Sequence, residues 1–158
     1  MAKLVDPRQP RFGQAITGSV LLVGFVFDWP VVLPVIAAIL AGASFLGSEG
    51  NLYAYLYRGA KRVFHLGPPA ELEEVGPPRF ANTLGFLFTT AGSLLYYVAD
   101  AAAAAWTLGL IVSALALLAA TTGLCVGCEA YVIARRIATH GRVRERLVVP
   151  REQVGIGA

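Results

Sequence analysis

Two long segments of this sequence, residues 12–57 and 80–134, contain no lysine or arginine. All 13 basic residues fall outside them, while 56% of the 158 residues are hydrophobic and only 15% are charged. So little charge excludes an ordinary soluble domain. Each segment is long enough for two membrane-spanning helices of about 20 residues. The sequence therefore predicts a membrane protein.

An aspartate interrupts each segment near its middle, at Asp28 and Asp100. Aspartate can cap the start of a helix through its side-chain oxygen, and Pro30 suits a first helical turn. We therefore expect an all-α membrane protein with four transmembrane helices, at residues 12–28, 30–48, 80–98 and 101–124.

The basic residues predict the orientation of these helices. With an even number of spans, residues 3–11, 58–79 and 135–151 share one face, and the opposite turns carry only Asp28 and Asp100. Lysine and arginine are enriched on the cytoplasmic side of membranes. We expect both termini in the cytoplasm and no cleaved signal peptide. The positive-inside rule and attraction to anionic lipid together explain the lysine and arginine residues, so we expect no nucleic-acid partner.

Short sequences recur in the two halves of the chain. Residues 10–14 resemble residues 78–82, and residues 57–63 resemble residues 131–137. This pattern predicts two parallel two-helix repeats related by a pseudo-twofold axis along the membrane normal. The expected units are a cytoplasmic arm at 1–11, a first repeat at 12–64, a Pro-rich linker at 65–79, a second repeat at 80–141 and a tail at 142–158.

The only two cysteines, Cys125 and Cys128, lie in the second half, where they align with Asn51 and Ala54 of the first. A scaffold role shared by both halves would not need them. Nineteen residues separate Trp106 from Cys125, which is about 28 Å of helix and close to the thickness of the hydrocarbon layer. The thiols are therefore expected at the cytoplasmic boundary.

Four roles for the cysteine pair are open. A pair at this spacing in a reducing compartment is typical of redox or sulfur-carrying chemistry. Cysteine also packs as a small apolar side chain, or accepts a lipid. Zinc needs four ligands, and Cys125 and Cys128 with Glu129 or His140 reach that number only if a homo-oligomer supplies a second pair. We assign neither a metal nor a cofactor to the chain.

The local helix structure decides which thiol is activated, and two alternatives are open. If the fourth span continues to Arg136, then Cys125, Cys128 and Glu129 share a helix face. If Gly123 or Gly127 breaks it, Cys128 begins a short basic helix whose N-terminus would stabilise a thiolate.

Three stretches resemble a known family: residues 6–12, 77–81 and 125–131, which read DPRQPRF, PPRFA and CVGCEAY. They are similar to the bacterial integral membrane family named domain of unknown function 4395, over about residues 5–141. The resemblance implies a multi-pass protein of the bacterial inner membrane. It also implies soluble partners of the thioredoxin-like or rhodanese-like kind. Matched by position, its functional residues would be Cys125, Cys128, Glu129 and Tyr131.

The function we expect is thiol–disulfide or sulfane-sulfur exchange at the cytoplasmic face. Cys128 would attack and Cys125 would resolve the mixed species, while Glu129 takes a proton and Arg135 or Arg136 favours the thiolate. With one dithiol and no cysteine near the outer turns, the chain cannot relay electrons across the membrane by itself. The alternative is a non-enzymatic module: a small-molecule channel or transporter, or a membrane anchor for a soluble partner.

The linker between the repeats holds two Gly-Pro-Pro triplets, at 67–69 and 76–78, around the acidic residues 71–74. Proline favours extended backbone, so we expect a stiff cytosolic loop. It either connects the second and third helices or serves as a docking arm for a soluble thiol protein.

Overall fold

The structure, a computed structural model, describes residues 4–46, 50–63, 65, 67, 71–138 and 148–150. Within these ranges the chain forms six helices and three short strands. In order they are β1 (Leu4–Val5), α1 (Arg8–Val26), α2 (Val32–Phe45), α3 (Leu52–Val63), β2 (Glu71–Glu74), α4 (Gly76–Tyr97), α5 (Ala102–Thr122), α6 (Val126–Ala138) and β3 (Val148–Pro150). The predicted helical fold is confirmed, and the strands add a small sheet that the sequence did not predict.

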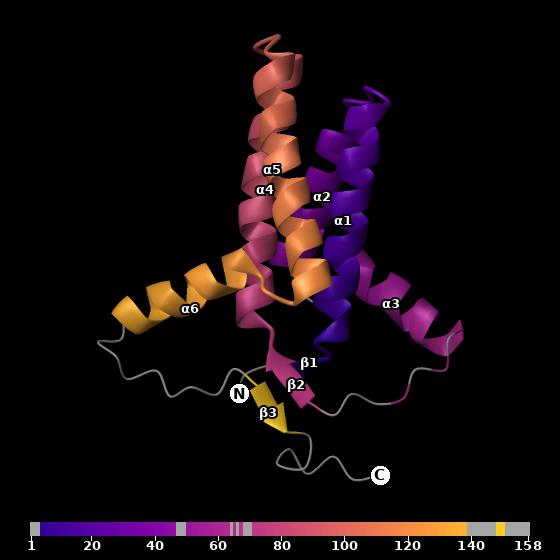
Figure 1. Cartoon of the computed structure of the whole chain (residues 1–158), viewed down its shortest axis with the longest axis vertical. Helices are drawn as coiled ribbons and strands as arrows, with labels where there is room; N and C mark the ends of the chain where they lie inside the picture. The colour runs from indigo at the N-terminus through magenta and orange to yellow at the C-terminus, as the bar shows by residue number, and fades with distance from the viewer. Residues whose placement is uncertain are drawn as a thin grey trace.

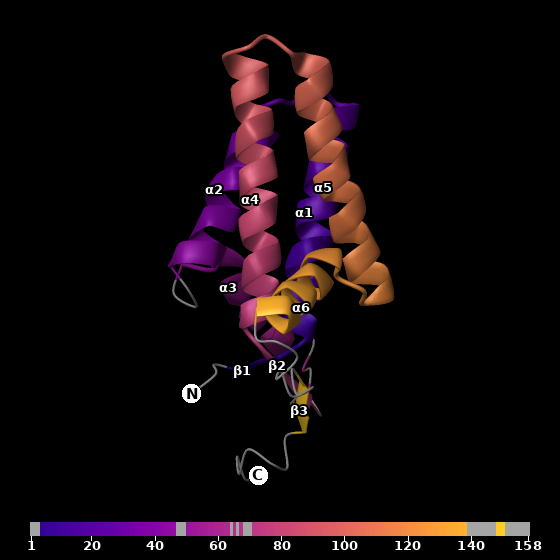
Figure 2. The ribbon, with the colours of Figure 1, turned by 90° about the vertical axis from the view of Figure 1, so that its left-hand side faces the viewer.

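The four long helices form an upright bundle, with the α1–α2 and α4–α5 turns at its upper end (Figure 1). Helix α1 packs mainly against α5, and α2 packs mainly against α4. At the lower end, the short helices α3 and α6 extend to opposite sides of the bundle, and the sheet lies beneath it (Figures 1 and 2). The basic residues of α3 and α6 therefore lie at the same end.

The two upper turns contain the aspartates that were expected to cap helices. That expectation is wrong, because the N-cap residues of α2 and α5 are Val31 and Ala101, and neither makes a side-chain capping bond. Asp28 and Asp100 instead adopt positive φ angles of 49° and 52°, a conformation that aspartate tolerates better than most residues. The same turn conformation thus recurs in both halves.

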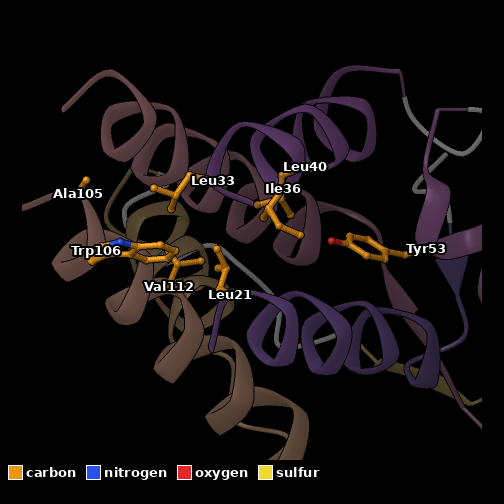
Figure 3. Packing of buried hydrophobic residues seen from close by; sticks show 8 residues of the cluster. All are labelled: Leu21, Leu33, Ile36, Leu40, Tyr53, Ala105, Trp106 and Val112. Atoms are coloured by element: carbon orange, nitrogen blue, oxygen red, sulfur yellow. The ribbon is translucent and has the colours of Figure 1, made fainter. Parts of the chain in front are cut away.

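The core lies between the four long helices and is closed below by α3 (Figure 3). It is built around eight buried side chains: Leu21, Leu33, Ile36, Leu40, Tyr53, Ala105, Trp106 and Val112. The two polar members of this cluster both have partners. Trp106 Nε1 donates to Asp28 Oδ1 at 3.2 Å, and the Tyr53 and Thr17 hydroxyls lie 2.5 Å apart. These bonds satisfy polar groups that would be costly to bury alone.

Small residues allow α1 and α5 to approach closely. A Cβ on Gly18 would lie 2.6 Å from Leu117 Cγ, and the Ser113 hydroxyl donates to the Gly18 carbonyl at 2.7 Å. Gly109 on α5 leaves similar room for Leu33. Small residues on both helices thus permit close packing in this part of the bundle.

The sheet joins the two halves beneath the bundle. Its order is β1-β2-β3 with antiparallel pairing, so β2 is central. Leu4 and Val5 pair with Glu74 and Glu73, and residues 71–73 pair with residues 148–150. The acidic stretch expected as a loop is therefore a strand, because its backbone is hydrogen-bonded on both sides. The following helix begins at Gly76 rather than at Phe80, since Pro77 and Pro78 suit the first turn of a helix.

Element order is the same in the two halves: one strand, two long helices and one short basic helix. Aromatic contacts repeat as well. The ring centroids of Phe12 and Tyr57 lie 5.9 Å apart, and those of Phe80 and Tyr131 lie 5.6 Å apart. Each pair joins the first long helix of a half to its short basic helix.

An ion pair also recurs in both halves. Asp6, before α1, lies 3.8 Å from Lys61 Nζ, and Glu74, before α4, lies 3.4 Å from Arg135 Nη1. Asp6 follows β1, and Glu74 is the last residue of β2. Each ion pair therefore connects the short basic helix of its half to the end of a strand. Such partly exposed pairs contribute little to stability, but they place α3 and α6 in equivalent positions.

Among the helices described, α5 is the one long and apolar enough to cross a membrane by length and composition. Helix α2 is apolar, but its 14 residues extend about 21 Å, short of the roughly 30 Å of a hydrocarbon layer. Helices α1 and α4 begin with polar and basic residues, including Arg11 and Arg79. Four spans of full length are therefore not supported by this criterion.

Gly123 ends α5 in the left-handed region, at a φ of 76°. A Cβ there would also lie 2.8 Å from Arg11 Nη2. Replacing Gly123 with alanine should lower the unfolding free energy by about 1–2 kcal/mol, the cost of a left-handed L-residue, and more if Arg11 cannot move. Thermal unfolding followed by circular dichroism measures this.

The matched control is Gly59→Ala in α3, where nothing lies within 4 Å of the added Cβ. In a helix interior this change should stabilise by about 0.5–1 kcal/mol. Equal changes in the unfolding free energy of the two variants would contradict the explanation that Gly123 avoids backbone strain in this turn.

Candidate functional site at the start of α6

Cys125 is the residue that starts α6. After Gly123 turns the chain out of α5, the Glu129 N–H donates to the Cys125 carbonyl at 3.0 Å, which is the first bond of α6. Helix α6 then runs from Val126 to Ala138. Of the two alternatives left open by the sequence, the broken helix is correct. Cys125, however, occupies the capping position that was expected for Cys128.

The Cys125 thiol lies where hydrogen-bond donors converge. The Cys128 thiol donates a hydrogen bond to it, and this is the largest reason why the pKa of Cys125 falls from 9.0 to about 6. Burial raises the pKa, but the Cys128 and Gly127 backbone N–H groups and the Gln14 amide lower it further. A lower pKa increases the fraction of the thiol that is ionised near neutral pH. The donors around Cys125 therefore favour a thiolate at this residue.

Gln14, a residue of the first half of the chain, contacts this thiol directly. Its Nε2 donates to Cys125 Sγ at 3.3 Å across 111 positions of sequence. Gln14 lies in α1, so the bond joins the bundle to the start of α6. The amide supplies a donor to the sulfur without adding a charge.

Cys125 also borders two cavities. The first, which we call the inter-helix cavity, has a volume of about 250 Å³ and lies between α4 and α5, with the start of α6 at one end. Its walls are mostly aliphatic and aromatic side chains. Four polar side chains line it: Gln14, Thr17, Asn82 and Cys125. The sulfur thus faces an apolar space that has few polar groups.

The second space, the basal cavity, lies below the first and has a volume of about 190 Å³. Arg11, Gln14, Glu74 and Glu129 line it together with both cysteines, and four prolines form much of its wall. Among the residues that the structure describes, only Gln14 and Cys125 line both cavities. Cys125 therefore lies at the boundary between an apolar and a charged environment.

The structure separates the residues that the sequence proposed for the site. Cys125, Cys128 and Glu129 come together at the basal cavity. Tyr131 packs on Phe80 instead. Arg135 forms an ion pair with Glu74, and Arg136 is exposed one residue further on.

Sequence reasoning missed Gln14 and Arg11 as members of the site. Both had a usable signal, since the Pro-Arg-Phe repeat contains Arg11 and Gln14 is a polar residue inside an apolar segment. Neither signal says which of the other helices these side chains will meet. Gly123 makes the approach of Arg11 possible, because it has no Cβ where the guanidinium lies.

A comparable space of about 570 Å³ lies between the two halves, lined by residues of the first half and by residues at the start of α4. In the alignment of the two halves, many of its lining residues match those of the basal cavity. They include Arg79 for Arg11, Asn82 for Gln14, Asn51 for Cys125 and Ala54 for Cys128. The two cavities thus have related walls, and only one has thiols.

Metal binding finds little support in this geometry. Within the ranges that the structure describes, no three His, Cys, Asp or Glu side chains are grouped so that they could hold a metal ion. His140, one of the zinc ligands considered from the sequence, lies outside those ranges.

A family model for domain of unknown function DUF4395 matches residues 5–136. The chain belongs to this family. The match covers both halves, from β1 through most of α6, and includes all the residues of the site. No curated protein and no solved structure matches the chain.

The hydrogen bond from Cys128 predicts a difference between two variants of this DUF4395 protein. In Cys128→Ser a hydroxyl can still donate to Cys125, so the pKa of Cys125 should stay near 6. In Cys128→Ala that donor is lost and the pKa should rise. The rate of iodoacetamide labelling of Cys125 is measured by mass spectrometry as a function of pH. The midpoint of that pH dependence gives the pKa of Cys125 in each variant. Labelling should slow as the pH falls through the midpoint, because protonation removes the thiolate.

Gln14→Leu in the Cys128→Ser background tests the amide in the same way and should raise the midpoint by a smaller amount. Identical midpoints in the serine and alanine variants would show that Cys128 does not set the acidity of Cys125.

Proposed function

We propose that this protein performs thiol–disulfide exchange through Cys125 and Cys128. One observation carries the proposal: Cys125 lies at the N-terminus of α6, where the Cys128 thiol, two backbone N–H groups and Gln14 all stabilise its thiolate. The thiolate is the reactive form of cysteine, and acidic thiols at helix starts are typical of redox sites. The attacking role moves from Cys128, as first expected, to Cys125.

The exchange proceeds in two steps. The Cys125 thiolate attacks a disulfide of the partner, forms a new S–S bond with one sulfur and releases the other as a thiolate. Cys128 loses its proton and attacks Cys125 Sγ, which forms the Cys125–Cys128 disulfide and releases the second partner thiolate. Glu129 at the basal cavity is placed to accept that proton. The reverse sequence oxidises a dithiol partner.

A sulfane-sulfur transfer uses the same geometry. Here the Cys125 thiolate takes the outer sulfur of a persulfide donor and becomes a persulfide, while the donor leaves as a thiolate. Cys128 can then release that sulfur by attacking Cys125 Sγ. A thioredoxin-like or rhodanese-like soluble protein fits either reaction, because its active-site sulfur would enter through the basal cavity.

Membrane insertion of the bundle is part of the proposal. Large apolar side chains are exposed on the outer faces of α1, α4 and α5, including Val23, Phe25, Leu87, Leu94, Ile111 and Leu118. A water-soluble bundle would place charged residues on those faces. We infer four membrane helices, with the basic lower end in the cytoplasm of a bacterium. The short α2 requires local thinning of the bilayer.

The short helices α3 and α6 support this orientation. Both extend sideways from the base of the bundle (Figure 1). Each combines exposed apolar residues with basic ones, such as Leu56 with Arg62 and Ile133 with Arg136. Helices of this kind lie in the headgroup region of anionic membranes. That position sets Cys125 near the membrane surface.

We infer that the two halves arose by duplication. The shared element order, the matching aromatic and ion pairs and the related cavities support it. Divergence then left thiols in one half only. A channel is the weaker candidate, since the inter-helix cavity is mostly apolar and offers few polar groups to a permeating solute.

The order of attack predicts which variant traps a partner. With glutathione disulfide, Cys128→Ser should accumulate a mixed disulfide at Cys125, because the resolving thiol is gone. Cys125→Ser should react at least about tenfold more slowly, since it lacks the acidic thiol. Intact-mass spectrometry of the quenched reaction gives both rates.

The wild-type protein is the reference and should end in the Cys125–Cys128 disulfide, with no mixed species left. If the two serine variants react at equal rates, the assignment of Cys125 as the attacking thiol is wrong. Failure of all three proteins to react would refute the exchange function.

The proposed topology also predicts the side of the membrane from which Cys125 and Cys128 can be labelled. A membrane-impermeant maleimide should label Cys125 and Cys128 in inverted vesicles and not in right-side-out vesicles. The control is Asp100→Cys in a background with both native cysteines changed to serine, which should label with the opposite sidedness because Asp100 lies in an upper turn. Equal labelling of the native cysteines from both sides would contradict the proposed topology.

A further inference from the structure

The inter-helix cavity has a feature that exchange with a soluble partner does not use. Its walls include Phe88, Ile111 and Leu115, whose side chains are about two-fifths exposed on the outside of α4 and α5. The cavity is therefore bordered by the apolar outer surface of the bundle, the surface that we place in lipid. Figure 2 shows α6 in front of the lower end of α4, the helix against which it packs, and the start of α6 lines this cavity.

The chemistry of the lining restricts what can bind there. Most of the wall is aliphatic or aromatic, so a charged or strongly hydrated ligand would lose its water without replacement. The Gln14 and Asn82 amides line the same cavity and can each donate to a carbonyl oxygen. The Cys125 sulfur lies beside Gln14, 3.3 Å from its Nε2. The lining therefore suits an apolar ring that carries carbonyl groups and reacts with a thiolate.

We propose that the inter-helix cavity binds a membrane quinone, which accepts the electrons of the Cys125–Cys128 dithiol. This inference rests on the proposed function, since it supplies the oxidant that regenerates the disulfide. It makes the site a junction between a soluble thiol partner at the basal cavity and a lipid-phase acceptor in the inter-helix cavity.

The step balances in atoms and electrons. The Cys125 thiolate adds to a ring carbon of the quinone and forms an S–C bond. The Cys128 thiolate then attacks Cys125 Sγ, so the S–S bond forms as the S–C bond breaks and the electron pair stays on the ring. The two ring oxygens take up two protons, equal to those that the two thiols give up. The dithiol is oxidised to a disulfide, and the quinone is reduced to a quinol.

The position of Cys125 explains why one thiol can serve both reactions. Of the described part of the chain, its side chain and that of Gln14 alone line both cavities. Cys128 lines the basal cavity but not the inter-helix cavity. Cys125 is thus the cysteine placed to meet the quinone, and Cys128 is placed to resolve the adduct from below.

The test uses the full chain, reduced and reconstituted in phosphatidylcholine vesicles, with ubiquinone-1 as the probe. One quinone should be reduced for each dithiol oxidised, measured by the ultraviolet absorbance of the quinone and by alkylation of the remaining thiols. Each protein is also oxidised with glutathione disulfide, which reaches the dithiol from water. For each protein we compare two rates of dithiol oxidation, and the quantity reported is the rate with ubiquinone-1 divided by the rate with glutathione disulfide.

Two matched variants locate the quinone. Ala130 is exposed and lines the inter-helix cavity, while Ala134 is exposed one turn further along α6 and does not. In Ala130→Phe the added ring should fill part of the cavity and lower the ratio at least about tenfold, a typical effect of steric change in an apolar pocket. Ala134→Phe should leave the ratio unchanged.

The outcomes separate this inference from the proposed function. If glutathione disulfide oxidises the dithiol and ubiquinone-1 does not, the quinone inference is overturned and the exchange function stands. If neither reagent oxidises it, both are overturned. Equal ratios for the two phenylalanine variants would show that quinone reduction does not use the inter-helix cavity, which also overturns the inference.

Discussion

The left-handed turn at Gly123 is the constraint on which the site depends. It ends α5 and redirects the chain, so that α6 leaves the bundle sideways instead of extending α5. The missing Cβ also makes room for the Arg11 guanidinium. Because the new helix starts three residues later, at Val126, the preceding residue Cys125 receives N–H groups of its first turn. A continuous helix would have committed those groups to carbonyls of the preceding turn and left the thiol without them.

The site combines two environments at one sulfur. Below Cys125 are charged side chains and proline-rich walls, and above it is an apolar cavity within the bundle. Burial alone would raise the pKa of this thiol, as it does for Tyr53, where desolvation outweighs the hydrogen bond from Thr17. The donors from Cys128, the helix start and Gln14 outweigh burial here. Partial burial with convergent donors gives a thiol that is ionised but sheltered from bulk water.

The comparison between halves indicates how such a site can arise. The arrangement of a strand, two long helices and a short basic helix exists twice, with equivalent contacts holding α3 and α6. At this position the second half differs from the first chiefly in having cysteines where the first has Asn51 and Ala54. The larger cavity at the equivalent position is lined instead by Arg58 of the first half and Arg79 of the second. The shared scaffold therefore sets the geometry, and substitutions at its cavity walls set the chemistry.

The sequence by itself determined the helical character, the four long apolar segments and the pair of cysteines, because composition and periodicity are local properties. It left open whether the fourth helix continues to Arg136 or breaks at Gly123 or Gly127. It did not determine the sheet, the partner of Arg135 or the roles of Gln14 and Arg11. Those depend on contacts between distant segments, such as the one from Gln14 to Cys125 across 111 positions. Only the packing of α1 against α5 brings these residues together, so the tertiary structure decided which thiol is acidic and what surrounds it.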